Sequence, residues 1–254
     1  MAGDAGAMLA GRLAVVTGAG GGLGRAIATA LAGQGARIVA VDLPAALEGL
    51  AAGWEGVAVD LAAPSAKAVL EALAARLGAV DIVVANAGVV PPWRGVAELD
   101  PEEWAQVMAI NVWGVAATLG AFAPALAISG RGAVVVMASI NGYRAHPRQV
   151  LYTASKHAVI GVMRAAALDL GARGIRVNAL APGAIATEAL RGRVAARHAA
   201  GGPAPEAALA ALAAETALGR IATEAEVAAA ALWLVSDAAS GITGVVLPVE
   251  AGLG

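Results

Sequence analysis

The sequence predicts an α/β protein in which helices cover both faces of a parallel sheet. Short runs rich in Val and Ile alternate with longer stretches of good helix formers along the chain. Such alternation is typical of βαβ units, whose right-handed crossovers build a parallel sheet. No linker, repeat or charge block divides the 254 residues. We therefore expect a single domain over residues 1–254, long enough to bury a substantial core.

Strands are expected where a continuous apolar run is bounded by Gly, Pro, Asn or Asp, because a strand buried on both faces has no polar side. In chain order these runs are Leu13–Thr17, Arg37–Asp42, Gly56–Asp60, Asp81–Ala85, Ala133–Ala138, Ile175–Leu180 and Gly244–Val249. The expected helices between them are Gly24–Ala32, Pro64–Leu77, Pro101–Ile128, Tyr152–Leu170 and Glu224–Val235. Proline at the first turn supports the starts at Pro64 and Pro101.

One region, from Thr187 to Leu218, interrupts the strand–helix pattern and contains Gly201-Gly202-Pro203. An interruption of this length within a compact domain is typical of a lid or a binding loop. We expect residues 188–217 to form a substrate lid.

Composition separates this chain from a membrane protein. The apolar fraction is 59% and the mean hydropathy is +0.73, but much of that fraction is alanine and there are 33 glycines. The longest uncharged run, Trp104 to Gly130, includes Gln106 and Asn111, whereas a membrane span needs about 20 strongly apolar residues. We interpret the run as a helix buried in protein, and we expect no membrane partner.

Charge and residue usage exclude further classes. A net charge of −2 gives no electrostatic reason to expect nucleic acid as a partner. The absence of cysteine excludes disulfides and thiolate metal sites, and the three histidines lack metal-ligand spacing, so we expect no metal. The first ten residues include Asp4 and no basic segment, which argues against a signal peptide. We therefore expect the protein to be located in the cytoplasm.

A glycine-rich loop connects the first expected strand to a helix. It reads T-G-x-x-x-G-x-G, through Thr17, Gly18, Gly22 and Gly24. Exposed backbone N–H groups and a helix N-terminus at this position favour a pyrophosphate. There is no G-K-[ST], which excludes a P-loop. The loop predicts a dinucleotide site.

Two aspartates end the next two expected strands. Asp42 stands 18 residues after Gly24, where a carboxylate can accept both ribose hydroxyls and repels a 2′-phosphate. Neither the glycine loop nor the position directly after Asp42 holds Arg or Lys, so NAD is favoured over NADP. Asp60 and Leu61 end the third strand in a similar way and could meet the adenine. A simple turn role remains the alternative for both aspartates.

Tyr152 and Lys156 form a pair with a clear chemical meaning. The chain has only two tyrosines and two lysines, and these two stand four residues apart on an expected helix. Residues at i and i+4 share one helix face. A free tyrosine has a pKa near 10, and a neighbouring cation lowers it toward the range that a general acid/base needs.

Three motifs together resemble the short-chain dehydrogenase/reductase family, in its short NAD(P)(H)-dependent branch. They are the T-G-x-x-x-G-x-G loop, Asn86-Ala87-Gly88, and Ser139 placed thirteen residues before Y-x-x-x-K. The resemblance runs from about Leu9 to Gly252. It implies a Rossmann-type, doubly wound, seven-stranded parallel sheet in one domain.

The resemblance also implies roles for individual residues. Ser139 should bind the substrate oxygen, Tyr152 should exchange the alcohol proton, and Lys156 should lower the pKa of Tyr152 and hold the nicotinamide ribose. Asn111 should position a water that links Lys156 to solvent. The implied cofactor-binding residues are Gly18, Gly22, Leu23, Gly24, Asp42, Asp60, Leu61, Asn86, Gly88, Tyr152, Lys156, Pro182, Ile185 and Thr187. The implied substrate-binding residues are Ser139, Tyr152, Trp93, Asn141 and Gln149.

Six arginines lie in or near the expected substrate pocket: Arg94, Arg144, Arg148, Arg191, Arg193 and Arg197. They would suit a substrate with a carboxylate or many hydroxyls. The favoured interpretation is that they solvate an alanine-rich surface.

The expected activity is NAD-dependent hydride transfer between a secondary alcohol and its ketone, the alcohol being a polyol, a cyclic alcohol or a hydroxy acid. The alternatives are an NADPH-dependent carbonyl or 3-oxoacyl-thioester reductase and a non-catalytic dinucleotide-binding regulatory subunit. The Tyr-x6-Lys spacing of an enoyl reductase is absent, since Val159 stands at the lysine position. Family members usually pair their apolar helices, so we expect Trp104–Ile128 and Tyr152–Leu170 to build a homotetramer or a homodimer.

Overall fold

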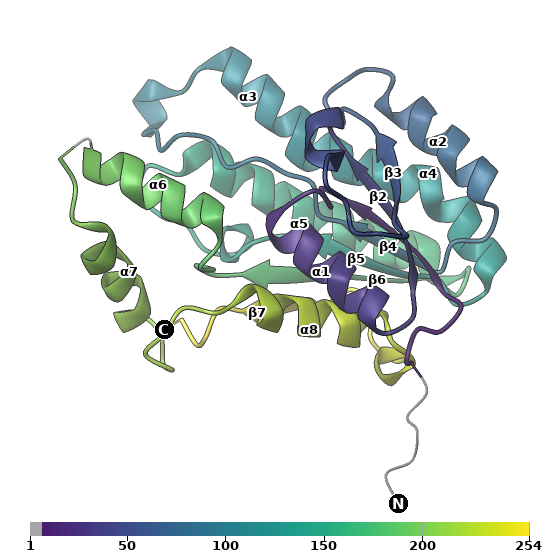
Figure 1. Ribbon diagram of the computed structural model, residues 1–254. Helices are drawn as coiled ribbons and strands as arrows, with labels where there is room; N and C mark the ends of the chain where they lie inside the picture. Colours follow the sequence, from purple (N-terminus) through teal and green to yellow (C-terminus); the bar gives the residue numbers. More distant parts are fainter. Residues whose placement is uncertain (1–6, 200, 254) are drawn as a thin grey trace, which may run out of the picture.

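The computed structural model describes residues 7–199 and 201–253 and contains one seven-stranded parallel sheet (Figure 1). The strand order is β3-β2-β1-β4-β5-β6-β7, so the chain winds outward in both directions from β1. The strands are β1 (Leu13–Thr17), β2 (Arg37–Asp42), β3 (Glu55–Ala58), β4 (Ile82–Ala85), β5 (Ala133–Met137), β6 (Arg176–Pro182) and β7 (Val246–Val249). The prediction of a doubly wound, single-domain α/β fold is confirmed, and the strand boundaries differ from the expected ones by a few residues.

Helices cover both faces of the sheet. The α-helices are α1 (Gly22–Gly33), α2 (Ala66–Leu77), α3 (Pro101–Met108), α4 (Gly114–Ser129), α5 (Val150–Gly171), α6 (Glu188–Ala199), α7 (Pro205–Ala214) and α8 (Glu224–Val235). The short 3-10 turns are η1 (Pro44–Leu47), η2 (Val96–Glu98), η4 (Ile140–Gly142) and η5 (Asp237–Ala239).

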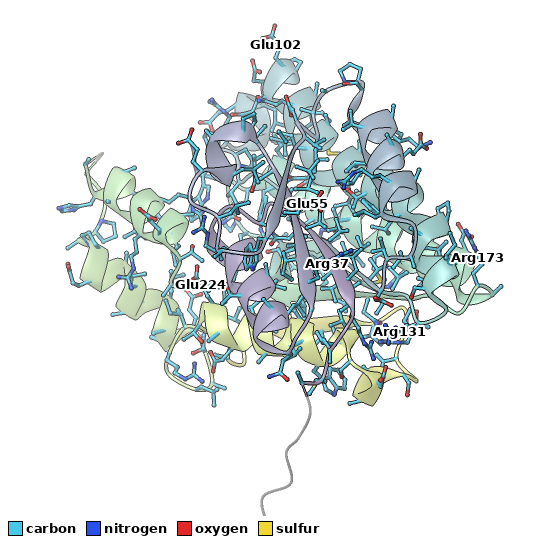
Figure 2. All side chains as sticks on the ribbon, turned by 45° about the vertical axis from the view of Figure 1, so that its right-hand side comes forward. Arg37, Glu55, Glu102, Arg131, Arg173 and Glu224 are labelled. Carbon is cyan, nitrogen blue, oxygen red and sulfur yellow. The ribbon has the colours of Figure 1, made fainter. Side chains whose placement is uncertain are left out.

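Two apolar cores lie on opposite faces of the sheet. One core holds Leu70 of α2, Phe122 of α4 and Met163 of α5 against one strand face. The other holds Leu31 of α1 and Leu234 of α8 against the opposite face. Charged side chains such as Glu102, Arg131 and Arg173 stand exposed at the rim (Figure 2). Alternate residues of β1, β4 and β5 therefore enter different cores, which explains why these central strands are apolar throughout.

The expected single helix Pro101–Ile128 is interrupted by a π-helical turn, η3 (Ala109–Trp113), between α3 and α4. By length and composition the combined helix Pro101–Ser129 could cross a membrane, but 56% of its most apolar stretch is buried inside the fold. It is a core helix, as expected from its polar interruptions. The π turn carries Asn111, which has no exposed surface.

The segment where a lid is expected folds mainly as two helices, α6 and α7, rather than as a loop. They project from one end of the sheet (Figure 1). Among its described residues α6 buries only Val194, and α7 buries none. The apolar periodicity that predicts a helix reflects a buried stripe, so helices without such a stripe escape detection from the pattern.

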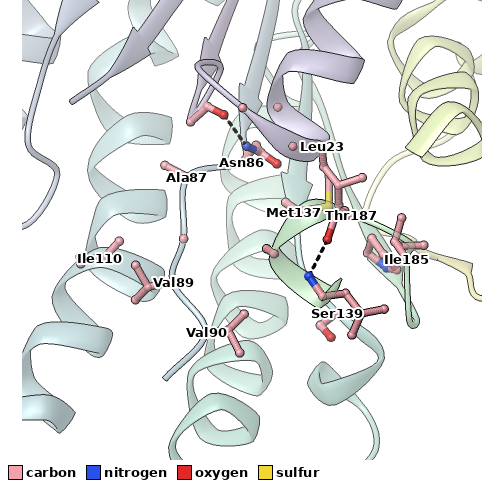
Figure 3. Close-up of a pocket in the computed structure, with 18 of the residues that line it drawn as sticks. Leu23, Asn86, Ala87, Val89, Val90, Ile110, Met137, Ser139, Ile185 and Thr187 are labelled. Atoms are coloured by element: carbon pink, nitrogen blue, oxygen red, sulfur yellow. Dashed lines mark hydrogen bonds between the residues drawn. The ribbon is translucent and has the colours of Figure 1, made fainter. Parts of the chain in front are cut away.

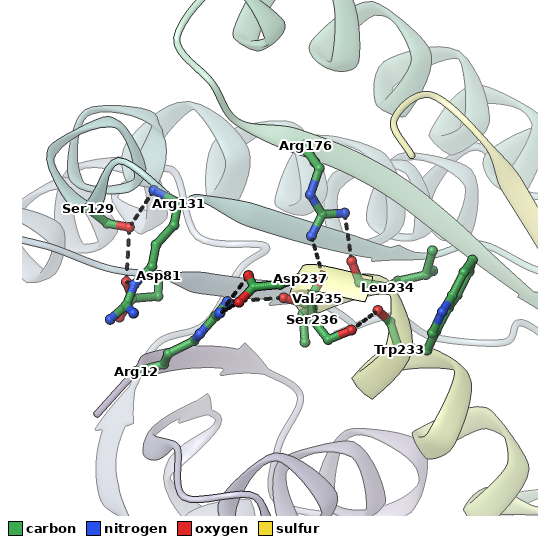
Figure 4. Close-up of polar contacts among 10 residues, drawn as sticks. All are labelled: Arg12, Asp81, Ser129, Arg131, Arg176, Trp233, Leu234, Val235, Ser236 and Asp237. Carbon is green, nitrogen blue, oxygen red and sulfur yellow. Dashed lines mark hydrogen bonds and ion pairs between the residues drawn. The ribbon is translucent and has the colours of Figure 1, made fainter. Parts of the chain in front are cut away.

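Polar clamps hold the amino ends of the strands (Figure 4). Arg12, directly before β1, contacts Asp237 at 2.7 Å and donates to the carbonyl of Val235. Arg176, at the start of β6, donates to the carbonyls of Leu234 (2.8 Å) and Ser236 (3.1 Å). These guanidinium groups donate to carbonyls that have no partner inside helix α8, and their positive charge is favourable at the negative, C-terminal end of the α8 dipole.

Asp81, directly before β4, forms a second clamp. Its carboxylate accepts from Leu13 N (2.8 Å), Ser129 Oγ (3.0 Å) and Arg131 Nε (2.7 Å). Burial raises the pKa of Asp81, but these hydrogen bonds outweigh it and hold the pKa below its ordinary value. The strands are thus aligned at this edge, and the opposite, carboxyl edge is left open for a site.

Candidate active site

A cleft of about 870 Å³ lies at the carboxyl ends of the strands (Figure 3). Open α/β sheets bind ligands at this edge, next to the point where the strand order reverses. Every residue that the sequence assigned to the cofactor lines this cleft, and Ser139 lines it too. These residues come from the ends of β1 to β6, from the segments that follow them, and from the start of α5.

Close backbone contacts explain the glycines of the first loop. A Cβ on Gly24 would stand 1.9 Å from the carbonyl oxygen of Gly18, and a Cβ on Gly18 would stand 2.8 Å from Asn86 Nδ2. Asn86 donates to the carbonyls of Thr17 (3.0 Å) and Gly18 (3.2 Å), which ties this loop to the end of β4. The loop can fold this tightly only without side chains, and it presents backbone N–H groups at the start of α1.

Asp42 lines the cleft at the end of β2, beside the glycine loop. Its carboxylate accepts from Gly20 N (2.8 Å) and from Leu43 N (2.8 Å), which orients it toward that loop. Arg25, which the sequence analysis did not consider, lies nearby and donates to the carbonyls of Gly20 (2.9 Å) and Gly49 (3.4 Å). The only signal for it was its position directly after Gly24.

Tyr152 and Lys156 lie in the first two turns of α5, and both face the cleft. Lys156 Nζ lies 5.8 Å from the centre of the Tyr152 ring and donates to the carbonyl of Met137 at 2.8 Å (Figure 3). Its side chain is only 4% exposed. Burial lowers the pKa of Lys156 to about 8, because the apolar surroundings disfavour the charged form.

Burial acts on Tyr152 in the opposite sense. It raises the pKa of the phenol above the ordinary value, against the lowering effects of a hydrogen bond with Ser139 and of the positive charge of Arg193. A cation that lowers the pKa of this phenol is therefore Arg193, which the sequence identifies only as one of six arginines in or near the expected substrate pocket. The expected effect of Lys156 on Tyr152 stays a prediction.

Asn111 connects three elements behind the cleft. Its amide oxygen accepts from Val89 N (2.7 Å), and its Nδ2 donates to the Val89 carbonyl (2.9 Å) and to Ser155 Oγ (3.2 Å). A Cβ on Gly88 would lie 3.2 Å from Asn111 Oδ1 and 3.7 Å from Lys156 Nζ. The π turn thus brings Asn111 close to Lys156, while its role toward a water stays a prediction.

The predicted substrate residues divide into two groups. Ser139, at the end of β5, lines the cleft beside Tyr152. Asn141 is buried and donates to Gln149 Oε1 (2.8 Å) and Thr153 Oγ1 (3.2 Å). Trp93 and Gln149 line a small adjoining hollow that shares Tyr152 with the main cleft.

Several residues that line the cleft with Ser139 and Tyr152 belong to none of the sequence motifs. Val89, Val90, Ile110 and Met137 supply apolar walls, and the first turns of α6 supply Glu188, Ala189, Leu190 and Arg193. Thr187, at the start of α6, accepts a hydrogen bond from Leu190 N at 3.1 Å, which anchors this helix beside the cleft. Such residues could be located only once the course of the segment after β6 was known.

Comparisons with known proteins agree with this geometry. Residues 18–254 match the family model described as enoyl-(acyl carrier protein) reductase. Galactitol 2-dehydrogenase (L-tagatose-forming) of Cereibacter sphaeroides is 39% identical over 252 residues, which cover 96% of this chain and 95% of that protein. An NAD+-bound xylitol dehydrogenase structure matches with a TM-score of 0.88 and 29% identity, over 96% of this chain and 99% of that one.

A further structure, from Beutenbergia cavernae, is described as an NAD(P)-dependent gluconate 5-dehydrogenase with NADP bound at low occupancy. It matches with a TM-score of 0.86 and 36% identity, over 97% of this chain and 98% of that one. Solved relatives of this fold therefore bind either dinucleotide.

Proposed function

This chain belongs to the short-chain dehydrogenase/reductase family, and from that premise we propose that it is an NAD-dependent dehydrogenase that interconverts a secondary alcohol and its ketone. The observation that carries the proposal is the meeting of Ser139 and Tyr152 with the glycine loop in one cleft. The alcohol is a polyol, a cyclic alcohol or a hydroxy acid, and the names of the galactitol and xylitol dehydrogenases support this class. The segment 188–217 serves as the substrate lid.

The residues present fit a dinucleotide. The glycine loop leaves space that a Cβ would fill, and its N–H groups stand at the N-terminus of α1, where a pyrophosphate is favoured. Asp42 is held beside that loop and can accept the ribose hydroxyls. Bound NAD supplies the hydride acceptor. Ile185 and Thr187 also line the cleft, which supports their assignment to the nicotinamide site.

Ser139 and Tyr152 bind the substrate oxygen and transfer its proton. The Ser139 hydroxyl binds the oxygen, and Tyr152 accepts the alcohol proton during oxidation or donates it during reduction. Because burial raises the pKa of Tyr152, its phenol is protonated and ready to donate at neutral pH. Oxidation needs the phenolate, so it depends on the neighbouring cations Lys156 and Arg193.

Replacement of Tyr152 tests the proposal directly. We expect Tyr152→Phe to lower kcat by about a thousandfold, since general acid/base groups contribute about 10²–10⁴. NADH should still bind to this variant, which a fluorescence titration measures. The matched control is Tyr143→Phe, which alters the second tyrosine outside the cleft. A Tyr152→Phe enzyme that kept the wild-type kcat on a panel of polyols, hydroxy acids and cyclic alcohols would refute the proposal.

A second candidate is an NADPH-dependent carbonyl or thioester reductase. Arg25 favours it, because this cation lies against the Gly20 and Gly49 carbonyls next to Asp42. The carboxylate of Asp42 opposes it, since it would repel a 2′-phosphate. Initial rates with NADH and NADPH at equal concentration distinguish the two candidates. A non-catalytic subunit would show binding of either dinucleotide and no turnover.

A further inference from the structure

The structure distinguishes the six arginines that surround the expected substrate pocket. Most of them have partners or positions away from the cleft. Arg94 pairs with Glu103 at 2.9 Å, Arg148 pairs with Glu98 at 2.9 Å, Arg144 donates to the Leu253 carbonyl at 2.8 Å, and Arg197 stacks on Trp93 at 4.5 Å. Arg191 is exposed on α6 and does not line the cleft. A surface role accounts for these five side chains.

Arg193 is different. It lines the cleft together with Ser139 and Tyr152, and it is partly buried. No hydrogen bond or ion pair engages its guanidinium within residues 7–199 and 201–253. Its charge reaches the Tyr152 phenol, whose pKa it lowers. Arg193 therefore acts at the reactive end of the cleft and not at the end near Asp42.

The position of α6 fixes this placement. Arg193 and Arg197 are four residues apart and so lie on the same helix face. Arg197 stacks over the ring of Trp93, in the segment after β4, and Val194 is buried. These contacts hold α6 with the Arg193 face toward the cleft.

Two glutamates, Glu188 and Glu224, line the same cleft as Arg193, but neither forms an ion pair with it in the part of the chain that the structure describes. The wall around the Tyr152 end is apolar, with Val90, Ile110, Met137 and Leu190 among its residues. Glu188 also lines the cleft, but it stands five residues before Arg193 and lies on another face of α6. A guanidinium in an apolar wall is stabilised best by a carboxylate, which it can bind through two parallel hydrogen bonds.

We propose that Arg193 binds a carboxylate of the substrate, so that the preferred alcohol is a hydroxy acid of the aldonate type rather than a neutral polyol. This inference rests on the proposed function. The alcohol carbon gives its hydride to NAD, the hydroxyl proton goes to Tyr152, and the alcohol becomes a ketone. The carboxylate is unchanged and only orients the substrate against Ser139 and Tyr152.

Pairs of substrates that differ by one group provide the test. Galactonate and galactitol, xylonate and xylitol, and gluconate and sorbitol each differ by a carboxylate in place of a terminal CH2OH. We expect the wild type to have the higher kcat/KM for the acid of each pair. Arg193→Gln should lower that value about 10- to 100-fold, mainly through KM, which is the usual effect of losing a charged hydrogen bond. The neutral polyols should be affected by less than about twofold.

Control variants separate this role from others. Arg191→Gln removes a cation from the same helix outside the cleft and should leave both substrate classes unchanged. Arg193→Lys should recover part of the rate on acids, because it restores the charge but not the planar fork. NADH affinity of Arg193→Gln should equal that of the wild type. A parallel loss on acids and polyols, or weaker NADH binding, would overturn the inference.

A binding measurement keeps the inference testable apart from turnover. In the Tyr152→Phe background with NAD present, calorimetric titration should show galactonate binding that Arg193→Gln weakens about tenfold or more. Equal galactonate affinity with and without Arg193 would contradict the inference. Turnover of polyols but not of acids by the wild type would refute the role of Arg193 and leave the proposed function intact. Absence of turnover on every alcohol would refute the proposed function instead.

Discussion

Lys156 occupies a position that is unfavourable for the stability of the fold while its ammonium is charged. Its ammonium is buried, it donates to the Met137 carbonyl, and burial lowers its pKa to about 8. In the unfolded chain its pKa is about 10.4. The unfolded state therefore binds more protons between about pH 8 and pH 10.4, and stability rises with pH across that window. Below about pH 8 the full penalty of about 3 kcal/mol is present.

Lys156→Met should consequently stabilise the fold while it abolishes turnover. Removal of the buried charge should contribute about 3 kcal/mol at about pH 7, and loss of the hydrogen bond to Met137 should cost about 1 kcal/mol. Urea unfolding should show a variant that is more stable at about pH 7, with the difference shrinking toward about pH 10. Lower stability of the variant at neutral pH would contradict this assignment.

Asp42 should set the choice of dinucleotide. Asp42→Asn keeps an acceptor oxygen for only one of the Gly20 and Leu43 amides, and it removes the charge that repels a 2′-phosphate. We expect the ratio of kcat/KM for NADP over NAD to rise about tenfold, which corresponds to about 1.4 kcal/mol. Asp60→Asn, which changes another aspartate of the same cleft, is the control. An unchanged ratio in Asp42→Asn would show that this carboxylate does not select the cofactor.

At the scale of single elements, the glycine loop is the most constrained. Gly24→Ala should destabilise the protein by several kcal/mol, because its Cβ would stand 1.9 Å from the Gly18 carbonyl oxygen and overpacking typically costs about 1–3 kcal/mol or more. NADH affinity should fall with it. Gly33→Ala in the same helix has nothing within 4 Å of its Cβ and should be neutral or slightly stabilising. Thermal unfolding of both variants, with NADH titration, checks the pair.

The elements show where the sequence was sufficient and where it was not. The central strands β1, β4 and β5 could be predicted because both their faces are buried. The start of α8 could be predicted too, because Thr223 caps it and its hydroxyl accepts from Glu226 N. The π turn at Ala109–Trp113 could not be predicted, since it follows from the contacts of Asn111 with Val89 and Ser155, which are distant in sequence. The helices α6 and α7 were missed because they bury almost no apolar stripe.

The residues of the candidate site also divide into those that the sequence could predict and those that it could not. Residues in motifs could be placed because strand ends of a parallel sheet converge at one edge. Arg193 could not be distinguished from Arg191 or Arg197, since only the orientation of α6 places one of them in the cleft. The orientation of Lys156 toward the Met137 carbonyl was equally inaccessible, because it depends on the packing of α5 against the end of β5.

At the scale of the whole molecule, large apolar side chains stay exposed on the central helices. Leu168 of α5 is 82% exposed, Ile128 of α4 is 69% exposed, and Trp113 between α3 and α4 is 49% exposed. Isolated apolar residues are common on surfaces, but several on adjoining helices are typical of a subunit interface. These side chains support our expectation of a homotetramer or a homodimer.

Size-exclusion chromatography with light scattering checks that expectation. The wild type should elute well above the chain mass of 24.7 kDa. Leu168→Asp should shift the distribution toward smaller species, because a charge buried at an interface without a partner is strongly unfavourable. His157→Gln, an exposed polar change on α5, should not shift it. Elution of the wild type as a monomer would contradict the assembly.

The clamps of Arg12, Asp81 and Arg176 also affect which mutations this protein can tolerate. They join strands and helices at the amino edge of the sheet, whereas the cleft lies at the carboxyl edge and is lined partly by α6, which buries only Val194 among its described residues. Alignment of the scaffold and recognition of the substrate are therefore separated in space. On the proposed role of α6 in substrate binding, we expect mutations in this helix to alter specificity with little loss of folding stability, so that exchange of this one segment gives the scaffold new substrates.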